Sequence, residues 1–301
     1  MCRQSYSGAS SQLVHPGKYQ IKTADGFSYD SFNPRARPSL WCVQRMFEKC
    51  NFLGFLAEPG HWGTQFLDIG RFDCMIFLAA VEMRCKPELY DHRTRKQPVQ
   101  VDSELVRVGN TSFKIRSSLF LPEIAKPVTQ EDMYFVFIDK DTRKPTSPPS
   151  WWKEKYARYS QPNEGPRGMR SYDLSQAADA VDHEEFRVRS VDLDPYCHVN
   201  NAAYLRFCYE TYVSSHIRKF GYRSNGDPFR NVRNIICNFK GDADFGDLLK
   251  VSFIEAPCNE GALYFQIVNG SKGVIFECTM EFFPQLECER EEREKYAVTM
   301  G

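Results

Sequence analysis

Apolar residues between positions 38 and 55 recur every three or four residues, which is the spacing of one face of a helix. We therefore predict an amphipathic helix there and a second one over residues 202–220. Shorter segments rich in β-branched and aromatic residues surround these helices and are typical of strands. The predicted strands are 73–84, 97–107, 111–121 and 133–139 after the first helix, 184–191 before the second, and 233–240, 247–255, 262–269 and 273–283 after it.

These segments follow the same order twice, so the chain is predicted to contain two copies of one plan. Residues 99–121 align with residues 248–270 at an offset of 149 positions. Each copy is expected to be a helix followed by an antiparallel meander, with the helix packed on one sheet face, which makes the protein α+β. Trp151 and Trp152 are expected to anchor the segment between the copies to a sheet. The predicted parts are an N-terminal tail (1–17), a first domain (18–150), a linker (151–182), a second domain (183–285) and a C-terminal tail (286–301).

Composition narrows the class of protein. With 39 Lys and Arg against 39 Asp and Glu the formal charge is zero, which argues against a general nucleic-acid binder because such proteins neutralise phosphates. The longest apolar stretch, residues 74–81, is far shorter than the ~18 residues that span a membrane. The eleven cysteines contain no C-x-x-C pair, so reduced thiols in an intracellular protein are expected. The N-terminal stretch lacks the apolar core of a signal peptide, which favours a cytoplasmic protein and leaves a weak organellar transit peptide open.

Residues 192–201, which read D-L-D-P-Y-C-H-V-N-N, carry the most chemistry and directly precede the second predicted helix. Asn200 or Asn201 is well placed to cap that helix. A helix N-terminus offers unpaired backbone N–H groups and a partial positive charge, so a thioester carbonyl placed there is polarised and its developing oxyanion stabilised. A carboxylate a few residues upstream can attack the carbonyl or activate a water against it. The order of acid, tight loop and helix start therefore favours acyl-transfer chemistry.

The run D-L-D-x-x-x-H-V-N-N-x-x-Y at 192–204 resembles the active-site loop of the hotdog-fold thioesterases. Within that superfamily, which includes 4-hydroxybenzoyl-CoA thioesterase, the chain looks most like the double-hotdog acyl-ACP thioesterases of plants and bacteria. Residues 239–247 and 138–145 resemble two further family elements, and the likeness covers about residues 18–285. The resemblance implies two repeats of a long helix wrapped by a curved antiparallel sheet. It also implies one active site per chain, on the second repeat. In the first repeat, residues 30–38 stand where the active-site loop would be.

By position in these motifs, the resemblance implies roles for individual residues. Asp194 is expected to be the nucleophile or general base, and His198 with Asn200 to position water or the thioester. The helix start near Val199 is expected to bind the oxyanion, and the acyl tail to run along the helix. The implied catalytic residues are Asp194, His198, Asn200 and Asp242, and the implied substrate-binding residues are Tyr196, Val199, Asn201, Tyr204 and Phe207.

Three positions depart from the plant-type enzymes. Tyr196 stands where those enzymes carry an asparagine, which removes support for a water-positioning amide there. Asp242 occupies the place of a glutamate that often assists catalysis. Ala243 stands where the family has a cysteine, so a Cys–His mechanism has no support from this position.

The resemblance therefore implies a thioester hydrolase that releases a free acid and a thiol from acyl-CoA or acyl-carrier protein, with no cofactor and no metal ion. No nucleic acid partner and no membrane span are expected, and a homodimer is left open. One alternative is a hotdog hydratase or dehydratase with a D-x-N-P-x-H loop. Against it, Asp194 replaces the asparagine and an extra residue separates Pro195 from His198. A second alternative is an acyl-binding hotdog protein without catalysis, for which the Tyr196 departure is the best support.

Overall fold

The computed structural model describes residues 4–6, 9–55, 66–161, 171–172, 174, 181–195, 197–222, 227–256 and 261–284. Its helices are α1 (Leu40–Phe55), α2 (Ser150–Tyr156) and α3 (Asn201–Phe220), with short 3-10 turns at Tyr29–Ser31, Phe66–Arg71, Pro87–Leu89, Ala157–Tyr159 and Ser190–Asp192. Its strands are β1 (Gln4–Tyr6), β2 (Ala9–His15), β3 (Lys18–Thr23), β4 (Met75–Cys85), β5 (Val99–Val108), β6 (Ser112–Phe120), β7 (Thr129–Ile138), β8 (Asp182–Arg187), β9 (Val232–Phe239), β10 (Leu248–Glu255), β11 (Ala262–Asn269) and β12 (Gly273–Phe282).

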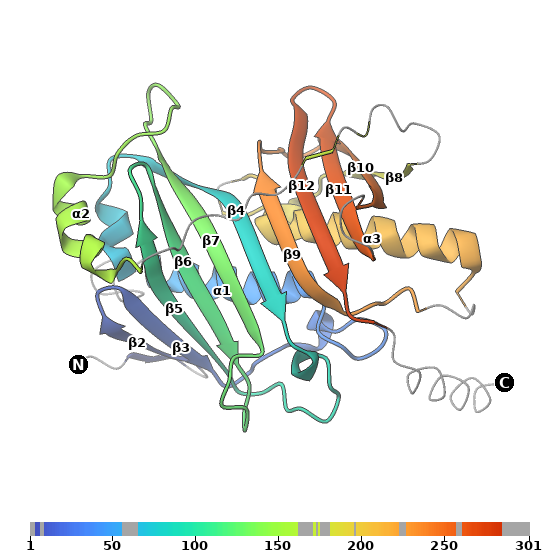
Figure 1. The fold of residues 1–301 in the computed structure, drawn as a ribbon, viewed down its shortest axis with the longest axis horizontal. Coiled ribbons are helices and arrows are strands. Elements are labelled where there is room, and N and C mark those ends of the chain that lie inside the picture. The colour runs from blue at the N-terminus through green and yellow to red at the C-terminus, as the bar shows by residue number, and fades with distance from the viewer. Residues whose placement is uncertain are drawn as a thin grey trace.

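The strands of the described part form one 12-stranded antiparallel sheet in the order β1-β2-β3-β5-β6-β7-β4-β9-β12-β11-β10-β8 (Figure 1). Its two halves have equivalent connections. In the first, β3 is followed by α1 and then by β4 to β7, and in the second β8 is followed by α3 and then by β9 to β12. The halves meet where β4 pairs with β9, for example at Val81 opposite Cys237. The sheet is therefore continuous from one half to the other.

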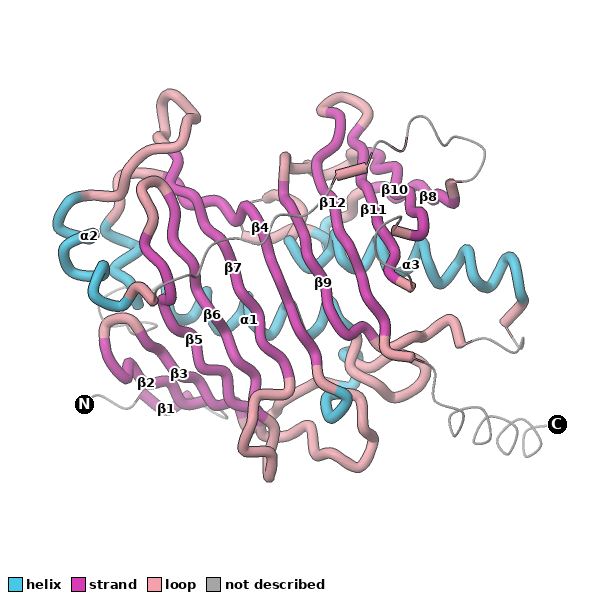
Figure 2. The backbone as a smooth tube through the Cα atoms, viewed as in Figure 1, coloured by secondary structure: helices cyan, strands magenta, loops and turns pink. Residues whose placement is uncertain are grey.

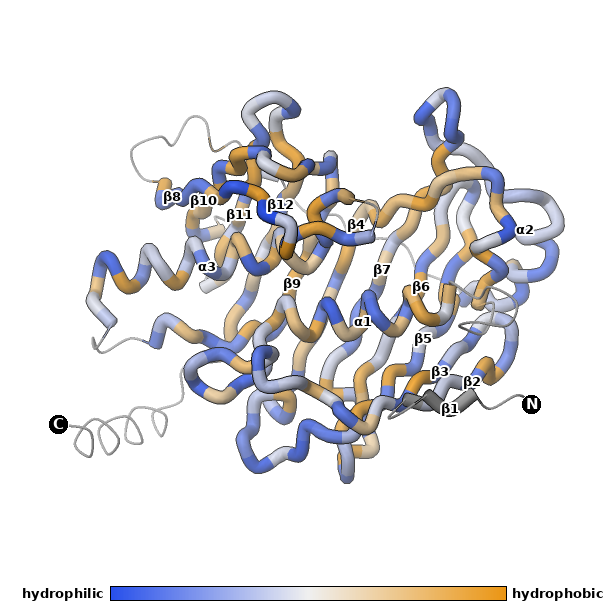
Figure 3. The backbone as a smooth tube through the Cα atoms, turned by 180° about the vertical axis from the view of Figure 1, so that it is seen from behind, coloured by the Kyte–Doolittle hydropathy of each residue, from blue (hydrophilic) through white to orange (hydrophobic). Residues whose placement is uncertain are grey.

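Both long helices lie on the same side of the sheet, which curves around them (Figures 1 and 2). Figure 3, from the opposite side, shows α1 and α3 in front of the strands, with hydrophilic and hydrophobic residues interspersed along each helix. In α1 the buried side chains include Val43, Phe47 and Cys50, at the three- and four-residue spacing that defines one helix face. This pattern explains why the segment forms a helix and which face it turns to the strands.

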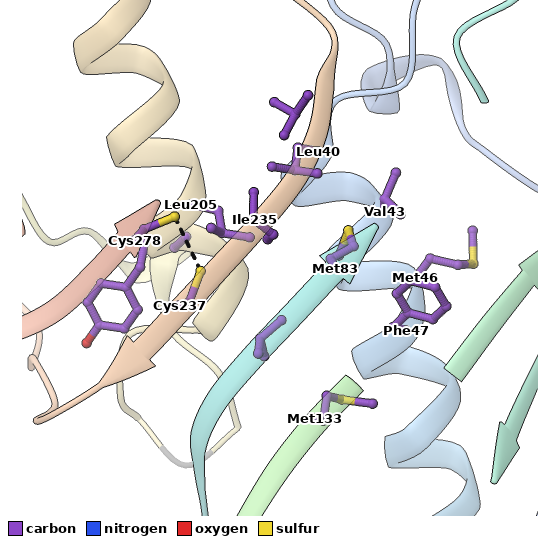
Figure 4. Close-up of a cluster of buried hydrophobic side chains, with 14 of the residues drawn as sticks. Leu40, Val43, Met46, Phe47, Met83, Met133, Leu205, Ile235, Cys237 and Cys278 are labelled. Carbon is purple, nitrogen blue, oxygen red and sulfur yellow. Dashed lines mark hydrogen bonds between the residues drawn. The ribbon is translucent and has the colours of Figure 1, made fainter. Parts of the chain in front are cut away.

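One hydrophobic core runs through both halves. Figure 4 shows Val43 and Phe47 of α1 close to Met83 of β4, with Leu205 of α3 and Ile235 of β9 on the other side of the junction. All five side chains are buried in the same cluster. Because α1 and α3 share this core, each helix is held in a fixed position relative to the other half of the molecule.

The start of the linker is anchored to the sheet by its two tryptophans, as the sequence indicates. Trp152 in α2 is fully buried and its indole N–H donates to the backbone oxygen of Leu67 at 2.7 Å. Its ring packs against Phe113 and Phe137 at centroid distances of 5.6 and 5.4 Å. Trp151 is partly buried and packs against the same core.

Part of the predicted N-terminal tail forms a strand. Residues 9–15 are β2, which pairs antiparallel with β3. Their sequence, A-S-S-Q-L-V-H, has too few apolar residues to indicate a strand, so the backbone hydrogen bonds offered by the edge of β3 decide its conformation. The predicted C-terminal tail, 286–301, lies outside the described residues, as does most of the linker beyond position 161. Within the described part of the chain, no helix combines the length and the apolar character needed to cross a membrane.

Candidate active site

The loop before α3 forms a tight turn from Asp194 to His198, which hydrogen bonds between these residues close. The Asp194 N–H donates to the backbone oxygen of His198 at 2.8 Å, and the Cys197 N–H donates to that of Asp194 at 3.0 Å. The His198 N–H in turn donates to Oδ1 of the Asp194 carboxylate at 3.2 Å. Cys197 takes a left-handed conformation, with φ of +64°, to complete the turn. The loop therefore fixes the direction of the half-buried Asp194 side chain.

Two of the backbone N–H groups near the helix start are already used. Val199 donates to the backbone oxygen of Ala243 at 2.9 Å, and Asn200 donates to that of Asp192 at 2.8 Å. The side-chain oxygen of Asn200 caps the helix by accepting from the Ala202 N–H at 3.0 Å. The N–H of Asn201, the first residue of α3, finds no acceptor among the described residues. The helix start at residues 199–201 is where the oxyanion is predicted to bind. Of its three backbone N–H groups, Asn201 therefore has the one without an acceptor among the described residues.

Asp242 lies beside His198. The backbone bond between Val199 and Ala243 holds the two segments together, and His198 Nε2 is 3.7 Å from Asp242 Oδ2. This separation suits an ion pair and is too long for a direct hydrogen bond. Lys272 Nζ donates to Asp242 Oδ1 at 2.8 Å, and this hydrogen bond is the main reason that the pKa of Asp242 lies below its usual value. Both His198 and Asp242 are about half exposed, at 42% and 47%.

Asp192, the first acidic residue of the loop, has a structural role. It is buried, and its carboxylate accepts from the backbone N–H of Arg189 at 2.8 Å. Its other oxygen pairs with Arg206 of α3, which also contacts Glu210 one helical turn further on at 3.3 Å. Asp192 thus ties the loop to the helix that it precedes.

Tyr204 and Phe207, two predicted substrate-binding residues, lie inside the core. Each has an exposed fraction of only 2%. The Tyr204 ring stacks on Phe276 of β12 at 5.2 Å between centroids, and Phe207 packs against Phe186 of β8 at 4.9 Å. Burial is the main reason that the pKa of Tyr204 is raised, and the nearby Asp242 adds to it. Tyr196 lies outside the described residues.

One residue of the site was missed by the sequence analysis. Asn200 Nδ2 donates a hydrogen bond of 2.8 Å to Oε2 of Glu48, which lies on α1 in the first half. Burial raises the pKa of Glu48 to about 7, against the lowering effect of the Asn200 hydrogen bond. The only signal in the sequence is that Glu48 is the single acidic residue of α1. No local motif connects it with the loop.

A groove of about 560 Å³ lies at the other end of α3. Its lining includes Tyr212, His216 and Lys219 of α3 together with Arg230 and Phe253. Because α3 has 20 residues and a helix rises ~1.5 Å per residue, this groove is far from the loop at Asn201. Among the described residues, no three His, Cys, Asp or Glu side chains are grouped so as to hold a metal ion.

A comparison with models of known protein families finds one match that includes the loop and α3. Residues 175–224 match the sequence model of the acyl-ACP thioesterase C-terminal domain. No curated protein sequence matches the chain. The family resemblance drawn from residues 192–204 is confirmed by this match, and the assignment as a thioester hydrolase is supported with it.

Solved structures show the same fold. The 12:0-ACP thioesterase from Umbellularia californica has a TM-score of 0.68 and 15% identity, over 91% of this chain and 100% of that one. An acyl-ACP thioesterase from Bacteroides thetaiotaomicron has a TM-score of 0.62 and 14% identity, over 89% of this chain and 97% of that one. A protein described as an oleoyl thioesterase from Lactobacillus plantarum has a TM-score of 0.64 and 13% identity, over 89% and 96%. The predicted α+β class is confirmed.

Proposed function

We propose that this protein hydrolyses acyl thioesters, with acyl-ACP as the leading substrate class and acyl-CoA as the alternative carrier. The observation that carries the proposal is the arrangement at the start of α3. There the fixed carboxylate of Asp194 lies a short distance along the chain from the unused N–H of Asn201. Attack on a thioester carbonyl requires a carboxylate as nucleophile or base and an N–H group to stabilise the oxyanion, and this segment supplies both.

The fold supports a duplicated arrangement in which each half is one hotdog unit. The equivalent connections around α1 and α3 are its basis. In this arrangement only the second half carries the reactive loop, since the first half has residues 30–38 at the corresponding place. The first half contributes α1, whose Glu48 reaches the loop.

The proposed reaction follows from these positions. The carbonyl oxygen of the thioester accepts from the N–H of Asn201, at the positive end of α3, so negative charge on that oxygen is stabilised as it develops. In one route Asp194 attacks the carbonyl carbon, the C–S bond breaks, and water hydrolyses the resulting anhydride between the acyl group and Asp194 to the free acid. In the other, Asp194 removes a proton from a water that attacks the carbonyl carbon itself. His198, paired with the ionised Asp242, positions the water or the thioester. Asn200 fixes the helix start, because its oxygen already caps Ala202 and its nitrogen donates to Glu48.

The choice of acyl-ACP as leading substrate rests on the family match over residues 175–224 and on the carrier named for two of the similar structures. The acyl tail is proposed to extend from the carbonyl along α3. Tyr204 and Phe207 are in the core in the described state, so they act in this proposal as the buried wall of that path and not as exposed contacts.

A screen of acyl-ACP and acyl-CoA substrates from short to long chains, with detection of the free thiol, tests the proposal. Thiol release above the uncatalysed rate, abolished by Asp194→Asn, is the expected result. Loss of enoyl absorbance from crotonyl-CoA without thiol release would instead establish a hydratase. Retention of acyl ligands with no turnover of any of them would establish an acyl-binding protein and refute the proposal.

A further inference from the structure

Glu48 reaches the reactive loop from the other half of the molecule. It lies on α1, and its Oε2 accepts from Asn200 Nδ2 at 2.8 Å. Helices α1 and α3 are packed against each other through the shared core, so this contact is held from both sides. A second carboxyl group is thereby fixed beside the start of α3, close enough to Asp194 for their charges to interact.

The surroundings of Glu48 favour its protonated form. Its Oε1 atom is buried and has no hydrogen-bond partner among the described residues. The charged and polar groups facing it are Arg45 and Gln44 on its own helix, Asp194 and Asn200 on the loop, and Glu131 on β7. Burial is the main reason that the pKa of Glu48 rises to about 7, and Asp194 adds to it, whereas Asn200 and Arg45 act against it. The fully buried Glu131 has a pKa raised well above its usual value, so it contributes little negative charge at neutral pH.

The reaction can use such a group. When Asp194 acts as a nucleophile it has no proton to give, and when it acts as a base its proton comes from the attacking water, so a separate acid can protonate the departing sulfur as the C–S bond breaks. A carboxyl group with a pKa near the working pH is the most effective proton donor, because enough of it is protonated and it still gives up its proton readily. Two carboxyl groups in unlike surroundings commonly divide the roles of base and acid in this way.

We propose that Glu48 is the general acid of the reaction and protonates the departing sulfur. This inference rests on the proposed thioester hydrolysis. As the C–S bond breaks, its electron pair moves to sulfur, the Glu48 O–H bond breaks, and an S–H bond forms. In the water route Asp194 has taken one proton from the attacking water, whose oxygen becomes part of the product acid. Asp194 then releases its proton to solvent and Glu48 takes one up, so the net change is one thioester and one water converted into one acid and one thiol.

The test compares two leaving groups in the variant Glu48→Gln. The glutamine of this variant can still accept the Asn200 hydrogen bond through its side-chain oxygen, but it has no acidic proton. With an alkyl thioester such as acyl-CoA, whose thiolate is a poor leaving group, kcat is expected to fall by about 10²-fold. With an aryl thioester of the same acyl group, whose thiolate leaves without a proton, kcat is expected to stay within about threefold of the wild type. Lys49→Gln, at the exposed neighbouring position of α1, is the matched control and is expected to leave both rates unchanged.

The pH profile supplies a second readout. For the alkyl thioester, kcat of the wild type is expected to decline above about pH 7, and this decline is expected to be absent in Glu48→Gln. Equal losses on both thioesters, or an unchanged profile, would show that Glu48 only holds Asn200 in place and would overturn the inference. Wild-type protein that releases no thiol from either substrate would overturn the proposed function, and this inference with it.

Discussion

The side-chain amide of Asn200 donates to the carboxylate of Glu48 over 2.8 Å, although the two residues are 152 positions apart in the chain. The same amide caps α3 by accepting from the Ala202 N–H. One side chain therefore fixes the start of the helix that holds the candidate oxyanion donor and joins it to the other half of the molecule. The first half thus contributes a carboxyl group to the candidate site on the second half.

Replacing Asp194 by Asn is expected to lower kcat by about 10²- to 10⁴-fold, because an amide can neither attack nor accept a proton. The turn should survive, since the amide oxygen of the introduced side chain can still accept from the His198 N–H. Thiol release and the thermal unfolding midpoint are the measurements. Asp141→Asn, in an exposed turn, is the control and is expected to be neutral. A wild-type rate in Asp194→Asn would rule out the proposed chemistry.

Replacing Asn201 by Pro removes the backbone N–H that is proposed to bind the oxyanion, together with the side-chain amide. Proline is favoured at the first position of a helix, and Asn200 already has the extended backbone, φ −60° and ψ 138°, that suits a residue before proline. We expect kcat to fall by about 10²- to 10³-fold with little change in stability.

Asn201→Ala, which keeps the N–H, is the matched variant and is expected to retain most of the activity. If Asn201→Pro folds and is as active as Asn201→Ala, the oxyanion must be bound by some other donor.

The raised pKa of Glu48 predicts how the stability of Glu48→Gln depends on pH. A carboxyl group whose pKa rises on folding from 4.5 to about 7 favours folding when protonated, and this contribution is lost as pH rises through that interval. The wild type should therefore lose stability relative to Glu48→Gln between about pH 4.5 and 7, by on the order of 3 kcal/mol. Urea unfolding of both proteins across this range measures the difference, in which the groups that do not interact with Glu48 cancel. Parallel stability curves would show that Glu48 titrates normally.

Cys197 is predicted to serve the shape of the loop and not the chemistry. Its φ of +64° is a conformation that costs a residue with a side chain ~1 kcal/mol, whereas glycine adopts it freely. Cys197→Gly is therefore expected to keep activity within about twofold, and Cys197→Val, with a β-branched side chain, to lower both stability and activity. A loss in Cys197→Gly as large as that in Asp194→Asn would implicate the thiol in the reaction.

The candidate loop could be recognised in the sequence because its residues are close together in the chain. Asp194, His198 and Asn200 lie within seven residues before a helix start, and the backbone hydrogen bonds that close this turn are all short-range, apart from the Val199–Ala243 bond. The two long helices and most strands could also be predicted from the sequence, because the apolar spacing of residues 38–55 and the β-rich segments each reflect one buried face. Strand β2 could not, because its conformation depends on the free edge of β3.

The sequence by itself therefore predicted the two long helices, most of the strands and the candidate loop with its acid, imidazole and amides. Only the tertiary structure decided which groups those residues meet. In the folded protein the N–H groups of Val199 and Asn200 donate to backbone oxygens, whereas that of Asn201 has no acceptor among the described residues. Tyr204 is buried in the core. The tertiary structure also brought Glu48 to the loop and enclosed its carboxyl group, which gave an ordinary helical glutamate a pKa near neutrality. Burial and long-range contacts of this kind depend on how the helices and sheet pack, and no local pattern of residues encodes them.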